Sequence, residues 1–195
     1  MVVIIDNYDS FSYNLYQLAG CFDKNALIIQ NSEKLLSELI ALNPSHIIIS
    51  SGRESASHEA MSEKVIEYFK GKCPILGVCF GHHTLCRVFG AMVSHASRVI
   101  HGESLNIHIA NGSEVFRGLP PIIQAGMYHS LSVKRNNLPD ELLIIAEDEH
   151  DEIMAVKHRD YEIYGLQFHP ESVLTPQGSV IIGNFLSVGR DSNRD

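Results

Sequence analysis

The chain has 195 residues, of which 45% are hydrophobic, and its formal net charge at pH 7 is −8. This length suits one domain with a sizeable core. The acidic balance, without long charge runs, argues against a nucleic-acid or anionic-membrane surface. No apolar run approaches membrane-spanning length, and the four cysteines lack the spacing of a disulfide framework. Residues 1–6 read as a strand and not as a signal peptide, so we expect a cytoplasmic protein.

The first ninety residues alternate predicted strands with predicted helices. Apolar runs predict strands at 2–6, 26–30, 46–50 and 74–78, and amphipathic spacing predicts helices at 11–19, 33–42 and 59–69. Asp9 or Ser10 is a candidate N-cap for the first helix. Continuous apolar strands separated by helices predict a mostly parallel central sheet with helices on both faces, and such sheets bind ligands at the carboxyl ends of their strands.

The second half of the chain is richer in strands. Short strands are predicted at 105–109, 122–125, 130–133, 142–146, 153–157 and 163–168, with turn dipeptides at 111–112 and 136–137 and a closing helix at 178–186. The expected fold class is therefore α/β, with an antiparallel, strand-rich second half added to the parallel sheet. We expect one domain over residues 1–188, followed by a polar tail over 189–195.

The most informative local pattern surrounds Cys79. An apolar run at 74–78 leads into the sequence Gly77-Val-Cys79-Phe-Gly81, and a helix-compatible segment follows at 83–89. A nucleophile at the tip of a strand-to-helix turn needs small neighbours on both sides, because the backbone folds back on itself there. The pattern predicts a nucleophile elbow with sulfur as the nucleophile, near the positive end of a helix dipole that favours a thiolate. A buried, inert cysteine is the alternative.

A second candidate group lies ninety residues further along. The segment 163–168 predicts a short strand, and Pro170 cannot extend a strand ladder, so we expect His169 at a strand end where side chains reach into a site. His169 could act as general base toward the thiol. Glu171 could hold the imidazole in the required tautomer, which completes a Cys-His-acid triad.

These two segments resemble the two signatures of class I glutamine amidotransferases. Three further stretches resemble the small subunits of anthranilate synthase and aminodeoxychorismate synthase. They are Asp-Asn-Tyr-Asp-Ser-Phe at 6–11, Tyr-His-Ser-Leu at 128–131 and Ile-Met-Ala-Val-Lys-His at 153–158. The resemblance extends from about residue 2 to about residue 187, with several motifs in the same order.

The resemblance also indicates where an oxyanion would be stabilised. The amide of Phe80, next after the nucleophile, is the expected first donor. The family takes a second donor from a loop that is usually Ser-Pro-Gly-Pro-Gly, and residues 50–54 here read Ser-Ser-Gly-Arg-Glu. Of the two glycines and two prolines of that loop, this chain retains one glycine, Gly52. The Glu54 carboxylate could oppose the developing charge and Arg53 could offset it; alternatively, both side chains point to solvent and the loop amides still act.

Other family positions concern the substrate. The family usually has glutamine four residues after the nucleophile, where it helps to hold substrate glutamine, but this chain has His83, which can titrate. Ser130 and Leu131 match the family's substrate-contacting backbone.

A zinc site is a competing interpretation of the same segment. Cys79, His82, His83 and Cys86 have the spacing of one helix face, and such side chains can bind zinc. Structural zinc sites usually take ligands from two segments, so we expect no metal site here.

The resemblance implies a glutaminase subunit that delivers ammonia to a larger, chorismate-aminating synthase subunit, with anthranilate synthase as the first expectation and aminodeoxychorismate synthase as the alternative. No cofactor is expected on this chain, and Mg²⁺ would belong to the partner. Two further alternatives remain: a regulatory or scaffold homologue impaired by its altered loop and His83, and a hydrolase acting on another small amide.

Overall fold

The computed structural model describes residues 1–52 and 55–189 of the chain. Within this part, one nine-stranded sheet forms the centre, in the order β2-β1-β3-β4-β9-β8-β7-β5-β6. Its strands are β1 (Val2–Asn7), β2 (Leu27–Gln30), β3 (His46–Gly52), β4 (Ile75–Val78), β5 (Val93–Ile109), β6 (Ile122–Val133), β7 (Leu142–Asp148), β8 (Ile153–His158) and β9 (Ile163–Leu166). The first five in the spatial order are parallel, and the pairs from β9 to β6 are antiparallel. The predicted fold class is confirmed.

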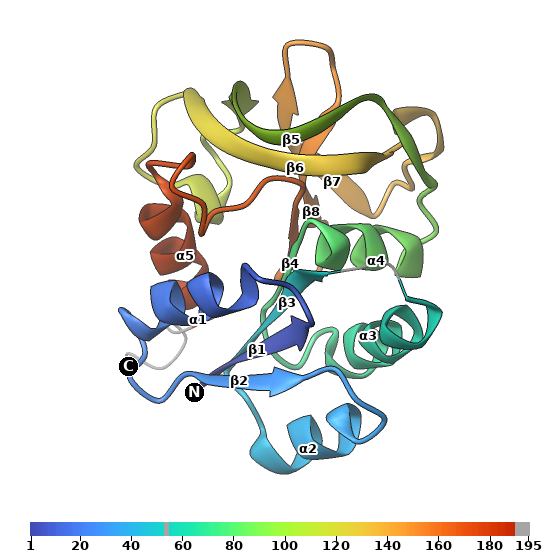
Figure 1. Ribbon diagram of the computed structural model, residues 1–195, viewed down its shortest axis with the longest axis vertical. Coiled ribbons are helices and arrows are strands. Elements are labelled where there is room, and N and C mark those ends of the chain that lie inside the picture. The colour runs from blue at the N-terminus through green and yellow to red at the C-terminus, as the bar shows by residue number, and fades with distance from the viewer. Residues whose placement is uncertain (53–54, 190–195) are drawn as a thin grey trace.

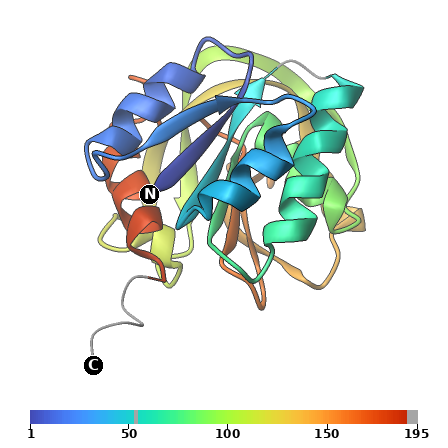
Figure 2. The same ribbon diagram turned by 90° about the horizontal axis from the view of Figure 1, so that it is seen from below.

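Helices cover both faces of the parallel half. Helices α1 (Ser12–Gly20) and α5 (Gly178–Ser187) pack on one face, while α2 (Leu35–Leu42), α3 (Ala56–Phe69) and α4 (Phe80–Val88) pack on the other (Figure 2). Alternate residues of each strand enter the two cores: Val2 and Ile4 join the α1/α5 core, whereas Val3 and Ile5 join the other. This explains the uninterrupted apolar runs, because both faces of the inner strands β1, β3 and β4 are buried.

Strands β5 and β6 form a long, curved pair that lies across the carboxyl ends of the parallel strands (Figure 1). The sequence predicted separate strands at 122–125 and 130–133, and this was wrong because β6 is continuous over Ile122–Val133. The intervening residues keep their partners on β5, which accommodates the register with two irregularities, between His95 and Ile100 and between His101 and Glu103.

Three local predictions near the site also need correction. Helix α1 has Phe11 at its N-cap position, with no side-chain cap, and the Asp9 carboxylate instead accepts a hydrogen bond from Ser51. Helix α4 begins at Phe80, directly after Cys79, and not at residue 83. Strand β9 ends at Leu166, so His169 lies beyond it and is held by an isolated bridge to Gly126.

Among the helices of residues 1–52 and 55–189, none has the length and apolar character needed to cross a membrane. The predicted tail lies outside the described residues, apart from Gly189.

Candidate active site

Cys79 occupies the strained turn that the sequence predicted. It lies between β4 and α4 with φ +50° and ψ −100°, a backbone conformation that a residue with a side chain rarely adopts. A Cβ atom on Gly77 would lie 2.4 Å from the carbonyl oxygen of Gly81, and one on Gly81 would lie 2.4 Å from the carbonyl oxygen of Ile49. The two flanking glycines are therefore required by backbone contact, which confirms the structural part of the elbow prediction.

The same turn places the sulfur at the start of a helix. Cys79 is the N-cap residue of α4, and its own N–H donates to the carbonyl oxygen of Leu166 at 2.7 Å. The side chain is partly exposed. The first amides of a helix point outward without intrahelical acceptors and favour a negative charge nearby. The geometry thus suits a thiolate on Cys79 and a developing oxyanion beside the Phe80 amide.

His169 and Glu171 form a buried pair. His169 Nδ1 lies 2.7 Å from Glu171 Oε1, and the two side chains are 2% and 0% exposed. Burial would lower the pKa of His169, but its interactions with the Cys79 side chain and the Glu171 carboxylate outweigh burial and raise the pKa to about 10. The Cys79 side chain is therefore close enough to influence the pKa of the His169 imidazole.

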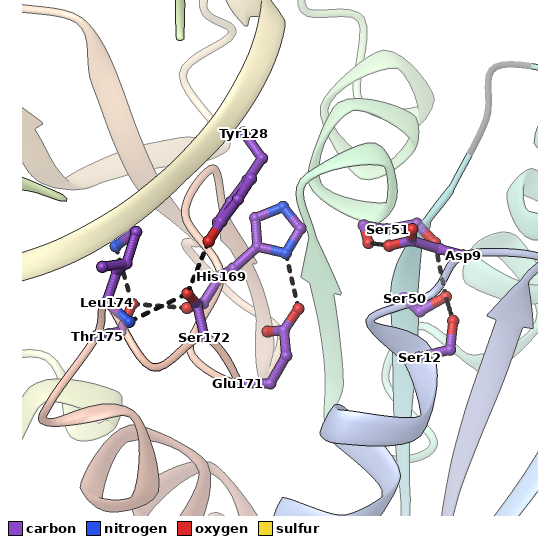
Figure 3. Close-up of polar contacts among 11 residues, drawn as sticks. Asp9, Ser12, Ser50, Ser51, Tyr128, His169, Glu171, Ser172, Leu174 and Thr175 are labelled. Carbon is purple, nitrogen blue, oxygen red and sulfur yellow. Dashed lines mark hydrogen bonds and ion pairs between the residues drawn. The ribbon is translucent and has the colours of Figure 1, made fainter. Parts of the chain in front are cut away.

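Two aromatic rings hold the imidazole of His169 in place. The centroid of its ring lies 5.3 Å from that of Phe11 and 5.1 Å from that of Tyr128. The backbone is fixed as well: the Thr175 hydroxyl donates to the His169 carbonyl oxygen at 2.6 Å, and the His169 N–H donates to the Gly126 carbonyl oxygen at 3.0 Å. Figure 3 shows the ring beside Tyr128, with its Nδ1 directed at Glu171. A rigid ring of this kind is suited to proton transfer.

A cavity of about 170 Å³ opens beside Cys79. Gly52, Phe80, His83 and the segment 128–131 complete its lining. The structure therefore gathers the described candidates for the oxyanion and substrate subsites, including Ser130 and Leu131, around the sulfur. Arg53 and Glu54, the other two candidates, lie outside the described residues.

The N-terminal segment supports the loop that carries Gly52. Gly52 is the last residue of β3 and pairs with Asn7 of β1, and a Cβ on Gly52 would lie 2.4 Å from Asn7 Cβ, so the loop that follows starts directly on the end of β1. Asn7 Nδ2 donates to the Ser50 carbonyl oxygen at 3.0 Å, and the Ser51 hydroxyl donates to the Asp9 carboxylate (Figure 3). Neither Asn7 nor Asp9 was predicted to belong to the site, although both lie in the 6–11 stretch that carries the family resemblance.

His83 borders the cavity, as expected, but its side chain is buried and contacts another side chain. Its Nε2 lies 2.8 Å from Oε1 of Gln167, another residue that the sequence analysis did not single out. Burial is the largest influence on the His83 ring and lowers its pKa to about 4. The ring is therefore neutral near pH 7 and does not titrate there.

The side chains of the competing zinc interpretation have other partners in the described part of the chain. No group of three or more His, Cys, Asp or Glu side chains in this part is arranged to hold a metal ion. His82 is buried with its Nδ1 3.7 Å from the Cys86 sulfur, while His83 turns to Gln167.

A larger cavity, of about 720 Å³, lies apart from Cys79, between β5 and the turn that joins β7 to β8. Arg98, Asp148 and Glu149 are among its lining residues, and no candidate catalytic residue is. Glu152 borders this cavity and pairs with His129 of the smaller one at 2.8 Å. The smaller cavity is the candidate active site because it holds the sulfur.

The parallel sheet, the cysteine elbow and the adjacent His–Glu pair define an α/β protein with a thiol-based candidate site. The model of the family "Glutamine amidotransferase class-I" matches residues 3–188, and the chain belongs to this family.

The relatives that match nearly the whole chain include components of two kinds of synthase. The chain is 42% identical over 191 residues to anthranilate synthase component 2 of Pseudomonas putida, covering 95% of this chain and 96% of that protein. It is 40% identical over 187 residues to aminodeoxychorismate synthase component 2 of Klebsiella aerogenes, covering 96% of this chain and 100% of that protein. It is also 42% identical over 189 residues to the bifunctional protein TrpGD of Thermotoga maritima, covering 96% of this chain but only 32% of that longer protein.

A solved structure shows the same fold. A Thermoplasma acidophilum protein described as a GMP synthase subunit superimposes with a TM-score of 0.88 at 24% identity, covering 98% of this chain and 94% of that one. At this identity the likeness concerns the fold alone.

Proposed function

We propose that this chain is the glutamine-hydrolysing component of a chorismate-aminating synthase, and that Cys79, His169 and Glu171 are its catalytic triad. One observation carries the proposal: a cysteine in a strained elbow lies beside a buried His–Glu pair, in a cavity open to a small molecule. Nucleophile, base and orienting acid thereby have the roles that amide hydrolysis requires.

The reaction begins at the sulfur. The Cys79 thiolate attacks the side-chain amide carbon of glutamine, and the carbonyl π electrons move to the oxygen. The amide of Phe80 and an amide of the Gly52 loop donate to this oxyanion. When the tetrahedral intermediate collapses, the C–N bond breaks, and His169 gives its proton to the leaving nitrogen. Ammonia and a glutamyl thioester result.

The second half of the reaction reverses these roles. A water molecule gives a proton to His169 and attacks the thioester carbon. Collapse of the second intermediate breaks the C–S bond, releases glutamate and restores the thiolate. Glu171 keeps the imidazole oriented through Nδ1. Its charge stabilises the imidazolium that donates in the first half and forms again in the second.

Substrate binding is assigned to the rest of the cavity. The backbone of Ser130 and Leu131 contacts the glutamine, and His83 occupies the position where the family usually has glutamine. The chain itself requires no metal or organic cofactor in this mechanism, and Mg²⁺ belongs to the partner. We place the protein in the cytoplasm, as one domain over residues 1–188.

The ammonia passes to a larger synthase subunit. Anthranilate synthase, which serves tryptophan biosynthesis, is the first candidate, and aminodeoxychorismate synthase, which serves folate biosynthesis, is the second. Relatives of both kinds have nearly the same identity to this chain, 42% and 40%, so sequence likeness does not separate them.

The decisive experiment measures glutamate release from glutamine by the purified chain, alone and with chorismate-aminating subunits of each kind from the same source. We expect release to appear or rise sharply with one of them, and the aminated product then identifies the pathway. Absence of release from folded protein that binds the partner would overturn the glutaminase proposal in favour of a scaffold role.

A further inference from the structure

We propose that Gln167 is a positioning residue that sets the tautomer of His83, and that His83 thereby ties the nucleophile helix to the strand that borders the substrate cavity. The consequences of this inference for catalysis rest on the proposed function. The contact between Gln167 and His83 is independent of that function.

The contact joins two elements of the site. His83 lies one helical turn after the nucleophile, and its N–H donates to the Cys79 carbonyl oxygen at 3.0 Å. Gln167 is fully buried, lies two residues before His169, and is anchored by its own N–H, which donates to the Met154 carbonyl oxygen at 2.9 Å. The 2.8 Å contact between their side chains therefore links the segments that carry the sulfur and the general base.

A third element meets the same ring. His83 and Leu131 line the same cavity, and the Leu131 backbone raises the pKa of the His83 ring, as a carbonyl acceptor does. Leu131 lies on β6 and borders the cavity. Through one imidazole, α4 and the 167–169 segment are thus joined to the substrate-facing strand.

A neutral imidazole offers one donor and one acceptor, so its two partners must differ in kind. If Gln167 presents Oε1, the proton must reside on His83 Nε2, and Nδ1 then has none to give to the Leu131 carbonyl. Among the described residues, the Gln167 side-chain nitrogen is also left buried without a partner. Both problems disappear when the amide is rotated by 180°, which exchanges two atoms of similar size.

In the rotated arrangement the hydrogen bonds run in one direction. Gln167 Nε2 donates to His83 Nε2, and His83 Nδ1 donates to the Leu131 carbonyl oxygen. Only the Gln167 carbonyl oxygen then lacks a partner among the described residues, and an unpaired acceptor is better tolerated than an unpaired donor. The structure therefore assigns the Nδ1–H tautomer to His83, with Gln167 as the group that selects it.

The test is the ¹⁵N spectrum of the full chain labelled at its histidine ring nitrogens, which distinguishes a proton on Nδ1 from one on Nε2. His83→Asn and His83→Gln identify the signal by its loss. We expect His83 to carry its proton on Nδ1, to lose this preference in Gln167→Met, and to keep it in Gln17→Met, the same change at an exposed site on α1. A proton on Nε2 in the unaltered chain would overturn the inference without any variant at Gln167.

A kinetic test follows from the same contact. Loss of one neutral hydrogen bond in Gln167→Met should raise the KM for glutamine by about fivefold. In His83→Asn, whose shorter side chain can still donate to Leu131 but does not reach Gln167, Gln167→Met should have little further effect. Full additivity of the two changes would contradict the coupling. The two proposals can fail separately. If the ¹⁵N spectrum shows the proposed tautomer but the chain has no glutaminase activity, the proposed function is overturned and this inference stands.

Discussion

The Asp9 carboxylate accepts a hydrogen bond from the Ser51 hydroxyl, so the N-terminal motif is joined directly to the loop that carries Gly52. The same motif reaches the other side of the site through Phe11, whose ring packs on His169. Tyr8, at 51% exposed, and Ser10 are its exposed residues. The 6–11 motif therefore supports the catalytic geometry from within, in addition to any role toward a partner.

Asp9 should accordingly matter for catalysis more than for folding. We expect Asp9→Ala to reduce kcat/KM for glutamine by about tenfold, because a small displacement of a catalytic loop has a large effect on rate. Ser51→Ala removes the other end of the same bond, so the double variant should be no worse than either single one. Steady-state glutaminase kinetics of the three variants, with thermal unfolding as the control for stability, would decide this; independent, multiplicative losses would contradict it.

Cys79→Ser should abolish glutamine-dependent product while leaving ammonia-dependent synthesis by the complex intact. The serine hydroxyl is far less acidic than the thiol and does not form the nucleophilic anion. Product formation by the reconstituted synthase, with glutamine or with ammonium chloride, measures both activities. Glutamine-dependent product from this variant would exclude the Cys79 mechanism.

Gly81→Ala should destabilise the protein by about 1–3 kcal/mol or more, because the added methyl group meets the Ile49 carbonyl oxygen on β3. Gly20→Ala is the matched control, since an added Cβ there meets nothing within 4 Å. Urea unfolding of both variants measures the difference. Equal stability of the two would show that the elbow can relax without loss.

The raised pKa of His169 predicts a fall in stability at alkaline pH. The folded pKa of about 10 exceeds the ordinary value of 6.5, so the folded state holds more protons than the unfolded state between these values. The stabilisation is fully present below pH 6.5 and is lost as pH rises through about 10. The free energy of unfolding of the unaltered chain should therefore fall more steeply over this range than that of His169→Asn; parallel curves would contradict the shift.

His83 should not make activity unusually sensitive to pH near neutrality. Its pKa lies at about 4 in the folded state, so the ring is neutral from pH 6 upward and has no proton to lose there. His83→Gln should change the KM for glutamine but leave the shape of the kcat/KM profile between about pH 6 and 8 unchanged. A new inflection, or the loss of one, in that range would show that His83 titrates in the working enzyme.

Local patterns predicted much of this molecule. The alternation of apolar runs and amphipathic helices indicated the parallel sheet, because a strand that is buried on both faces has a continuous apolar sequence. The glycines around Cys79 indicated the elbow for a similar reason, since backbone contact forbids a Cβ at Gly77 and Gly81. Strand ends were less accurate: β6 joined two predicted strands because its pairing with β5 continues through a region of irregular register.

The set of elements and the chemistry placed at their ends can be predicted from local patterns, because periodicity and steric exclusion act over a few residues. The tertiary structure alone decided which of these ends meet. Parallel pairing of β4 with β9 sets Val78 opposite Leu166, so the segments that carry Cys79 and His169 leave the sheet at the same edge. The contacts of Gln167 with His83 and of Asp9 with Ser51 depend on the same register, which arises from the packing of the whole core and from no local pattern.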